Sequence, residues 1–323
     1  MAQPTNLFDR YDGANAVRED LSDIIYNISP EDSPFMSNIG RGSAKQTYFE
    51  WQTDALASVD TANAQIEGND MTLGARSATS RVGNYTQISN KVIGTSGTVE
   101  AVGLAGMKSY LAYELAKASA ELKRDMEAII LNNQAAVVGN ATTARKTAGL
   151  PAWIRTNVQK GTGAAADPTL SGTTDGYPNA ARTDGTTVAY TEAMLKTAIQ
   201  QVWAQGGDPT IAMAGPTHKA AMSAFTGIQA NRMNISSAKA FAIVGTADVY
   251  LSDFGKVDMV PNRYQREREV FVFDPTYAQV DYLRSFSRFD LAKTGDSERK
   301  AILVEYGLRV KSEKAFAIIA DLT

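Results

Sequence analysis

His218 is the side chain whose chemistry matters most here, because it is the only histidine among 323 residues. A Ser–His–acid triad needs a histidine base, so any such triad would have to use this residue. His218 lies in GPTHKAAMS, at the start of a predicted helix, and no nucleophile-elbow pattern is near it. The sequence therefore predicts no catalytic residue.

The sequence also gives little support for a metal site or a phosphate-binding site. With one histidine and no cysteine, only an all-carboxylate site could hold a metal, and the acidic residues are spread out without calcium-loop spacing. The glycine-rich stretches GTGAAADPTLSGTTDG and GTSGTVEAVG lack GxGxxG and lack GxxxxGK followed by Ser or Thr, so they are typical of loops. We predict no metal, no cofactor and no enzymatic activity.

Two stretches are candidates for contact with nucleic acid. The first, RYQREREV at 263–270, alternates basic and acidic residues in a strand-like run, which favours cross-strand ion pairs over a phosphate-binding patch. The second is the aromatic trio Tyr48, Phe49 and Trp51, which has no basic groove beside it, so packing is predicted rather than base stacking. The net charge of −3 and the pI of about 5.4 also argue against a dedicated DNA binder.

The bulk composition is typical of a soluble globular protein, with 44% hydrophobic and 21% charged residues. The length allows one large domain or two ordinary ones. The N-terminal stretch lacks the basic and apolar regions of a secretory signal, and no run of about 18 apolar residues predicts a membrane span. The absence of cysteine excludes disulfides and fits a reducing compartment.

The clearest secondary-structure signal is an apolar stripe at helical spacing within residues 104–138. Its members recur every three or four residues: Leu104, Met107, Leu111, Leu115, Ala118, Leu122, Met126 and Ile129. We expect one long core helix that stops at Gly139 and runs roughly 50 Å at 1.5 Å per residue.

An extended flap is predicted before this helix. Residues 45–54 and 81–93 alternate like strands and flank a polar stretch, 55–80, that is rich in Ala, Gly and Thr. They predict two antiparallel strands joined by a long tip. Because an isolated two-stranded ribbon is only marginally stable, we expect the flap to need support from outside the chain.

The second half of the chain predicts an α+β fold with strands clustered late. Residues 156–190 are poor in large apolar side chains and predict a long surface insertion. A helix should begin after an N-cap at Thr191 and end at Gly206, before a buried strand at 209–215 and a helix at 216–226. Further strands are predicted at 247–252, 256–261, 268–274, 277–284, 300–311 and 315–322.

An irregular arm occupies residues 21–40. Pro30 and Pro34 interrupt it, so it cannot form one amphipathic helix. It nevertheless carries large apolar side chains, which need a groove in this chain or in another copy of it. A chain with no visible active site, an apolar arm and a long flap is typical of an assembly protein.

Four stretches in a fixed order resemble one family. They are DLSDIIYNISPEDSPFMSNIGR near the start, AGLPAWIRTN after the long helix, GGDPTIAMAGPTHKAAMSAF in the middle, and LAKTGDSERKAILVEYGLRVKSEKAFAIIADL at the end. With them the chain resembles the major capsid proteins of tailed bacteriophages, which have the HK-ninety-seven-like fold. The ordered set spans nearly the whole chain.

The resemblance implies a layout for the α+β fold. Its expected parts are 1–40 (N-terminal arm), 41–98 (extended loop), 99–150 (peripheral domain with the spine helix), 151–190 (loop insertion), 191–285 (axial domain) and 286–323 (C-terminal strands returning to the peripheral domain). The family offers no place for the insertion at 156–190.

The resemblance also implies a function. The chain would be the major capsid protein of a tailed double-stranded DNA phage, assembling as hexamers and pentamers into an icosahedral shell that encloses the genome. Neighbouring subunits would receive the large apolar side chains of the arm and flap: Ile24, Ile25, Tyr26, Phe35, Met36, Tyr48, Phe49 and Trp51. The expected location is the virion capsid, after assembly in the host cytoplasm.

The partners implied by the resemblance are further copies of the chain, a separate scaffolding protein, a portal protein and, as an option, a decoration protein. Packaged double-stranded DNA would be contacted without sequence specificity. Some relatives seal the shell with a Lys–Asn cross-link, but Lys45 and Lys91 of the flap show no pattern that supports one here. Two alternatives stay open: an encapsulin-type nanocompartment shell protein, and a phage tail or decoration protein.

Overall fold

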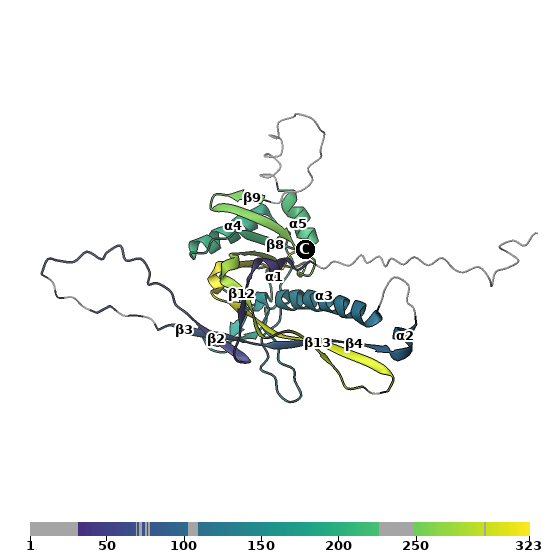
Figure 1. Cartoon of the computed structure of the whole chain (residues 1–323). Coiled ribbons are helices and arrows are strands. Elements are labelled where there is room, and N and C mark those ends of the chain that lie inside the picture. Colours follow the sequence, from purple (N-terminus) through teal and green to yellow (C-terminus); the bar gives the residue numbers. More distant parts are fainter. Residues whose placement is uncertain are drawn as a thin grey trace, which may run out of the picture.

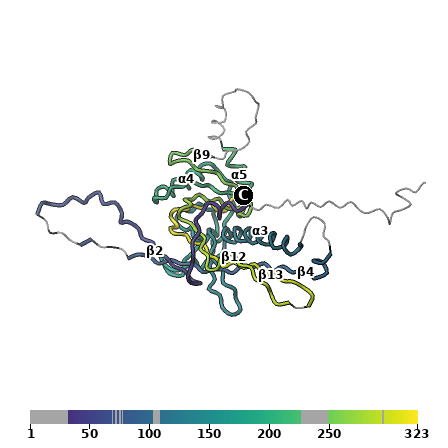
Figure 2. The backbone as a smooth tube through the Cα atoms, viewed as in Figure 1, coloured from purple at the N-terminus to yellow at the C-terminus, as the bar shows by residue number. Residues whose placement is uncertain are grey.

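The computed structural model describes residues 32–68, 70, 73–74, 76, 78–102, 109–225, 249–293 and 295–323. Within them a six-stranded and a four-stranded sheet, together with their helices, form the body, and a flap extends far from it (Figure 1). The same view as a tube shows the flap and the C-terminal hairpin of residues 278–310 extending in opposite directions (Figure 2).

The six-stranded sheet forms a wall between two hydrophobic cores. Its strands, in spatial order, are β5 Val158–Gln159, β14 Phe316–Ile319, β11 Val270–Phe273, β8 Ile211–Ala214, β10 Gly255–Pro261 and β9 Val249–Ser252. Every residue of β8, β11 and β14 is buried. In β11, Phe271 and Phe273 belong to the larger core, whereas Val270 and Val272 belong to the smaller one. A strand buried on both faces reads as a continuous apolar run, as these do.

Two helices cover one face of this wall and enclose the smaller core. Helix α4, Glu192–Ala204, begins after Thr191, whose hydroxyl accepts a hydrogen bond from the Met194 N–H, and the chain turns away at Gly206 with φ +90°. Helix α5, Pro216–Ser223, follows β8. Leu195 and Ile199 of α4 are completely buried in the smaller core. Both helices and the strand between them were predicted, and all three are confirmed.

The four-stranded sheet and the long helix enclose the larger core. The strands, in spatial order, are β1 Gly40–Ser43, β12 Ala278–Asp290, β13 Ser297–Val310 and β4 Gln87–Ser96. Helix α3, Tyr110–Leu131, packs on β4 and β13. Leu122 and Met126 of α3 meet Val304 and Tyr306 of β13 in this core, which also reaches the six-stranded sheet.

The long helix is shorter than its apolar stripe predicts. Helix α3 ends at Leu131 and Asn132 has extended backbone, so the expected continuation to residue 138 is wrong. The helix ends where the residues that follow it form hydrogen bonds with a distant part of the chain. The Asn133 side chain donates to the Arg182 carbonyl (2.7 Å) and accepts from the Arg182 N–H (3.0 Å), and asparagine is in any case a weak helix former.

Other parts of the helix prediction have different outcomes. Gly139 has φ +76° and lies in a later turn, so it is not the helix stop. The stripe is confirmed where Leu111, Leu122 and Met126 are buried. Two of its predicted members lie outside the described residues: Leu104 and Met107.

The predicted second strand of the flap divides in two. Strands β2, Tyr48–Thr53, and β3, Ser80–Tyr85, pair antiparallel and form the base of the flap. Residues after Thr86 form β4 instead, which pairs with β13 in the four-stranded sheet. Thr86 is completely buried and its hydroxyl donates to Glu305 (2.9 Å), which fixes the point where the chain changes sheets.

The C-terminal strands also divide between the sheets. Strand β13 joins the four-stranded sheet, but β14 pairs with β11 in the six-stranded one. The two strands after residue 296 therefore lie in different sheets, and the apolar residues of β14 fill both faces of the wall. The predicted strand at 268–274 starts later, at Val270, and the one at 277–284 continues to Asp290.

The described residues also form several shorter elements. They are α1 Pro34–Asn38, α2 Gly97–Ala101, η1 Leu150–Ala152, β6 Thr169–Leu170, β7 Pro178–Ala180, η2 Pro275–Tyr277 and η3 Glu313–Ala315. The segment 156–190 is not only a surface loop, because β5 extends the six-stranded sheet beside β14 and β6 pairs with β7 as a hairpin.

Truncation of Met126 tests the packing of α3. Met126→Ala should lower the free energy of unfolding by about 2–5 kcal/mol, because it leaves a cavity in the larger core. Lys123→Ala, at an exposed position of the same helix, should change it by less than about 0.5 kcal/mol. Denaturant titrations followed by circular dichroism measure both. Equal, small effects would contradict the position of α3 over the sheet.

Candidate functional site

His218 is part of the core. Its side chain is 2% exposed, its Nε2 is hydrogen-bonded to the main-chain oxygen of Glu267, and its ring meets Tyr190 edge-on with centroids 5.6 Å apart. Across the described ranges, no cluster of three or more His, Cys, Asp or Glu residues is placed to hold a metal ion. In the same ranges, no helix has the length and apolar character needed to cross a membrane.

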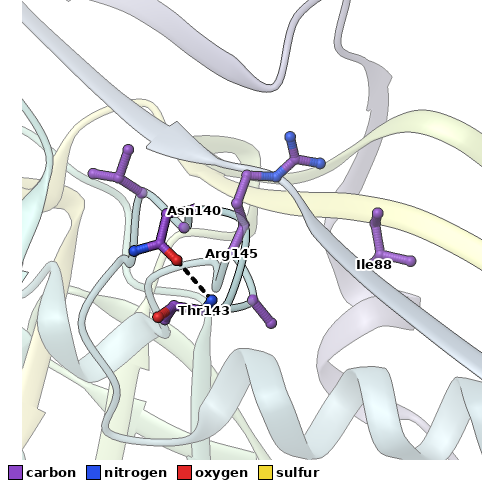
Figure 3. A pocket seen from close by; sticks show the side chains of 7 residues that line it. Ile88, Asn140, Thr143 and Arg145 are labelled. Atoms are coloured by element: carbon purple, nitrogen blue, oxygen red, sulfur yellow. Dashed lines mark hydrogen bonds between the residues drawn. The ribbon is translucent and has the colours of Figure 1, made fainter.

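The pocket in Figure 3 lies between β4 and the turn at residues 138–145. It has a volume of about 440 Å³ and combines the exposed apolar side chains of Ile88 and Val138 with a polar turn. Within that turn Asn140 Oδ1 accepts the Thr143 N–H at 2.8 Å, and Arg145 is held by Glu305 at 2.5 Å. The residues that line the pocket include no acid, histidine or cysteine.

The arm is anchored by a buried carboxylate of α3. Glu127 is completely buried, and its oxygens accept the N–H groups of Phe35 (2.7 Å) and Met36 (2.9 Å), which open α1. The side-chain amide of Asn262, after β10, donates a third hydrogen bond (2.7 Å). Glu127 thus caps α1 in place of Ser33, which makes no side-chain cap. Burial raises the pKa of Glu127, and the three hydrogen bonds oppose that rise.

The chain itself covers the arm side chains that the structure describes. Phe35 is completely buried beside Phe273, with ring centroids 5.5 Å apart, and Met36 is 8% exposed. Within the single chain Phe35 and Met36 are therefore covered by their own core, and contact of either side chain with a neighbouring subunit stays a prediction. The remaining arm residues of that prediction lie outside the described ranges: Ile24, Ile25 and Tyr26.

Phe49 and Trp51 fasten the base of the flap to the body. Phe49 is 5% exposed, and the half-buried Trp51 ring lies 5.3 Å from Trp153. The Arg309 guanidinium lies over both flap rings, 5.5 Å from that of Phe49 and 5.3 Å from that of Trp51. Phe49 is thus covered within its own chain, and its contact with a neighbouring subunit stays a prediction. For the half-buried Tyr48 and Trp51, contact with a neighbour stays a prediction.

The base of the flap also has support from the segment 156–190. The Gly83 N–H donates to the Gly176 carbonyl (2.9 Å), and the Gly176 N–H donates to the Arg81 carbonyl (2.8 Å). Gly176 therefore forms an isolated bridge beside Val82 of β3. The expectation that the flap depends on support from outside the chain is wrong for its base.

The tip of the flap, residues 54–79, presents apolar side chains to solvent. Leu56 is 99% exposed, Val59 90%, Ile66 81% and Leu73 101%. Exposed apolar groups gathered on one surface feature mark interaction sites. The polar composition of this stretch did not predict such an apolar surface; the four aliphatic residues set among Ala, Asn and Thr were the available signal.

The side-chain carboxylate of Asp321 holds together the two ends of the segment 156–190, which we call its neck. Asp321 is 2% exposed and accepts the N–H groups of Gly161 (3.1 Å) and Gly185 (2.7 Å), and it pairs with Arg268 (3.2 Å). Its φ of 60° is in the left-handed region, a conformation that aspartate adopts more readily than most residues. One side chain therefore holds both ends of the segment together.

The charged run at 263–270 contributes ion pairs to the same neck. Arg266 pairs with Asp184 (2.6 Å) and with Glu269 (2.7 Å). The predicted ion pairs therefore form, but they connect the run to the segment 156–190 and do not lie across a pair of strands. Glu269 is 1% exposed. Burial raises its pKa to about 7, although the charges of Arg266 and Arg182 lower it.

The chain matches a known family over almost its whole length: the model of the SU10 major capsid protein covers residues 3–323. The chain belongs to this family. A relative of the capsid protein, the major capsid protein of Escherichia phage Phieco32, is 32% identical, and the alignment covers 99% of this chain and 97% of the relative. The predicted function, a major capsid protein of a tailed phage within an icosahedral virion, is thereby confirmed.

Solved structures show the fold of this capsid protein. A chain of the Cyanophage A-1(L) capsid asymmetric unit has a TM-score of 0.67 at 13% identity, with 98% of this chain and 100% of that chain covered. The holo-SrpI encapsulin complex from Synechococcus elongatus has a TM-score of 0.56 at 12% identity, with coverages of 98% and 96%. The HK-ninety-seven-like α+β fold is confirmed. Likeness at such identities concerns the fold alone, so the family match decides for the capsid protein over an encapsulin.

Two residues with important contacts in the capsid protein were not identified from the sequence. They are Glu127, which caps α1, and Tyr177, whose ring packs against those of Tyr48 and Tyr85. Glu127 follows Met126 in the apolar stripe, and nothing in a single sequence marks it as a buried cap rather than a solvated carboxylate. Tyr177 could have been noticed, because it is the only aromatic residue between Trp153 and Tyr190. An isolated aromatic in a stretch of small residues indicates a packing contact.

Removal of the Glu127 carboxylate tests the anchor of the arm. Glu127→Ala leaves three buried donors without an acceptor, at about 1–3 kcal/mol each, so the free energy of unfolding should fall by about 3 kcal/mol or more. The arm should also become sensitive to protease. Glu121→Ala, which breaks only a surface pair with Lys91, should cost about 1 kcal/mol or less. Chemical denaturation and limited proteolysis compare the two, and equal stability with equal protection would rule out the anchoring role.

The raised pKa of Glu269 predicts a pH-dependent stability. Since the folded chain raises the pKa of this carboxyl from its ordinary value of 4.5 to about 7, its contribution to stability is fully present below pH 4.5 and is lost as the pH rises through 7. Glu269→Gln should remove a fall on the order of 2–3 kcal/mol between about pH 5 and about pH 8.

Thermal unfolding at both pH values measures this difference between wild type and Glu269→Gln. Glu127, whose pKa is also raised, should leave a residual slope of the same sign in the variant. Glu298→Gln, at an exposed position, should keep the wild-type slope. A Glu269→Gln variant with an unchanged slope would contradict the assignment.

Proposed function

We propose that this major capsid protein assembles as hexamers and pentamers, and that the flap tip of each subunit lies on a neighbouring subunit. The observation that carries the proposal is the exposure of Leu56, Val59, Ile66 and Leu73, which are 81–101% exposed in the single chain. The base of the flap is packed and hydrogen-bonded, whereas the aliphatic side chains of its tip have no cover. A second copy of the chain would supply that cover.

The energy of such a contact is large enough for assembly. Full burial of a Val, Leu or Ile side chain is worth about 1.5–3 kcal/mol, so four of them give about 6–12 kcal/mol before the entropy of association is subtracted. A flap that contacts a different surface of its neighbour makes a heterologous interface, and such interfaces close into rings when the rotation permits. Hexamers and pentamers are rings of this kind.

The proposed parts of the subunit follow the family layout. We assign α3 and the four-stranded sheet to the peripheral domain and α4, α5 and the six-stranded sheet to the axial domain. The arm comprises 1–40 and the extended loop 41–98, apart from β1 and β4, which belong to the four-stranded sheet. The packing of α3 on β4 and β13, and of α4 on β14 and β11, supports this division.

The proposal includes the partners of the shell. A separate scaffolding protein, a portal protein and, as an option, a decoration protein would join the capsid protein, with assembly in the host cytoplasm. Packaged double-stranded DNA would be contacted weakly and without sequence specificity. A subunit with a net charge of −3 suits this role, because tight binding requires Lys and Arg to neutralise phosphates. No enzymatic activity is part of the proposal.

Substitution of the aliphatic residues in the flap tip tests the proposal. A variant with Leu56, Val59, Ile66 and Leu73 all changed to Ser should fold with wild-type stability, because these side chains touch little of their own chain. Its yield of closed shells should fall by tenfold or more. Electron microscopy and sedimentation, with scaffolding protein present, measure the yield.

The matched control changes four exposed polar residues of the same tip to Ala: Ser58, Thr61, Asn63 and Thr79. It should assemble as the wild type does. A complete deletion of 55–79, closed by a short turn, should also abolish stable shells. If either the aliphatic variant or the deletion made shells at the wild-type yield, the proposed role of the flap would be rejected.

A further inference from the structure

We propose that the β6–β7 hairpin is a brace that sets the direction in which the flap leaves the body, with Gly176 and Tyr177 as its positioning residues. The inference rests on the proposed function, because the flap tip must point toward a neighbouring subunit for its direction to matter. It gives a role to the segment 156–190, for which the family layout offers none.

The first support is the backbone pairing between the hairpin and the flap. Gly176 lies beside Val82 as an isolated parallel bridge, with hydrogen bonds to Gly83 (2.9 Å) and Arg81 (2.8 Å). The two-stranded flap is thus tied to the hairpin by two backbone hydrogen bonds where it meets the body. Gly176 has φ +90°, and an added Cβ would lie 2.1 Å from Ser171 Oγ, so the contact requires glycine.

The second support is an aromatic cluster on the same junction. Tyr177 meets Tyr85 edge-on with ring centroids 5.1 Å apart, and it meets Tyr48 in the same way at 6.1 Å. The ring centroids of Tyr48 and Tyr85 are themselves 4.7 Å apart, and these directly paired residues begin β2 and end β3. One side chain of the hairpin therefore contacts both strands of the flap. Edge-on aromatic pairs have a preferred geometry, so this contact restricts the angle as well as the distance.

The third support is that the hairpin is itself held rigidly. The Ala136 N–H donates to the Pro178 carbonyl (2.9 Å), and Leu170 is 8% exposed within the larger core. At the other end, Asp321 joins the N–H groups of Gly161 and Gly185. Because the hairpin is fixed to the body at these points, its contacts with β2 and β3 hold the base of the flap in a fixed orientation relative to the body.

The geometry of a long ribbon makes this constraint consequential. An isolated two-stranded ribbon is marginally stable and free to bend and twist at its root. Half of the 54–79 tip, fully extended, reaches roughly 40 Å, so a swing of about 15° at the root would move the tip by roughly 10 Å. A displacement of that size would take Leu56 and its neighbours off any fixed contact surface.

The test shortens the brace and measures the flap directly. In the main variant an Asn-Gly turn replaces Ser171–Tyr177, which removes Gly176 and Tyr177 but keeps Leu170 in the core. Because the chain has no cysteine, Ser58→Cys in the flap and Ala116→Cys in α3 accept spin labels selectively. Electron–electron double resonance on the unassembled subunit then gives the distance from flap to body.

The labelled parent should give one narrow distance distribution. The shortened hairpin should broaden it or shift its centre by on the order of 10 Å, as the reach of the tip implies, and shell yield should fall by tenfold or more. Tyr177→Ala keeps the backbone pairing and should broaden the distance distribution less. If the shortened hairpin does not fold, this variant alone tests whether the hairpin sets the direction of the flap. Thr173→Ala combined with Thr174→Ala, at exposed positions of the same hairpin, should match the parent.

Each outcome bears on one claim. Distances that do not change in the shortened hairpin, or in Tyr177→Ala if only that variant folds, would overturn the brace. A changed distance with normal shells would overturn the importance of flap direction for assembly. Failure of the proposed function is seen separately, because the flap-tip variant would then assemble normally even though its hairpin is intact.

Discussion

The carboxylate of Glu127 is the interaction on which much of this subunit depends. It brings together α3, the first described turn of the arm and the loop after β10, which are far apart in the sequence. A buried carboxylate is costly unless its oxygens are satisfied, and here each of the three segments must be in place for that to hold. Phe35 then enters the larger core beside Phe273, and β1 follows directly and pairs with β12. The subunit is therefore fastened at its centre before any neighbour is present.

The flap has the opposite character, because its base is saturated with contacts and its tip has few. Arg309 lies over Phe49 and Trp51, and the β6–β7 hairpin pairs with β3, so the root has little surface left to offer. The tip, in contrast, exposes Leu56 and Leu73 almost completely. Such a division suits a protein that must be stable as a single chain and still keep apolar surface exposed for assembly. The apolar area needed for assembly is placed on an extension, where it does not endanger the core.

Much of the fold could be predicted from the sequence because the spacing of apolar residues indicates which side chains are buried. The stripe of α3, the cap at Thr191 and the apolar runs of β8, β11 and β14 are local signals, and all were predicted close to their observed places. The misses have a common cause in distant partners. Helix α3 stops early because Asn133 pairs with Arg182, and the predicted flap strand divides because Thr86 reaches Glu305. No window of the sequence contains both members of such pairs.

The candidate site was predicted only in outline, for the same reason. The arm and flap were identified as the places where the chain contacts others, but Phe35, Met36 and Phe49 are large apolar residues whose destination depends on a core assembled from remote strands. A single sequence shows that a side chain needs cover and not which copy provides it. The aliphatic residues of the flap tip were overlooked because their neighbours are polar and their spacing follows no regular period.

The six-stranded sheet has a mechanical consequence for the assembled shell. Since alternate residues of β8, β11 and β14 fill the two cores, the sheet cannot slide against either of them without disrupting both. Each subunit should then behave as a stiff plate, with no internal hinge between its halves. Whatever elasticity a capsid of this protein has under internal pressure would reside in the thin parts that join plates to one another, and a change in shell diameter would be a change in the angles between undeformed plates.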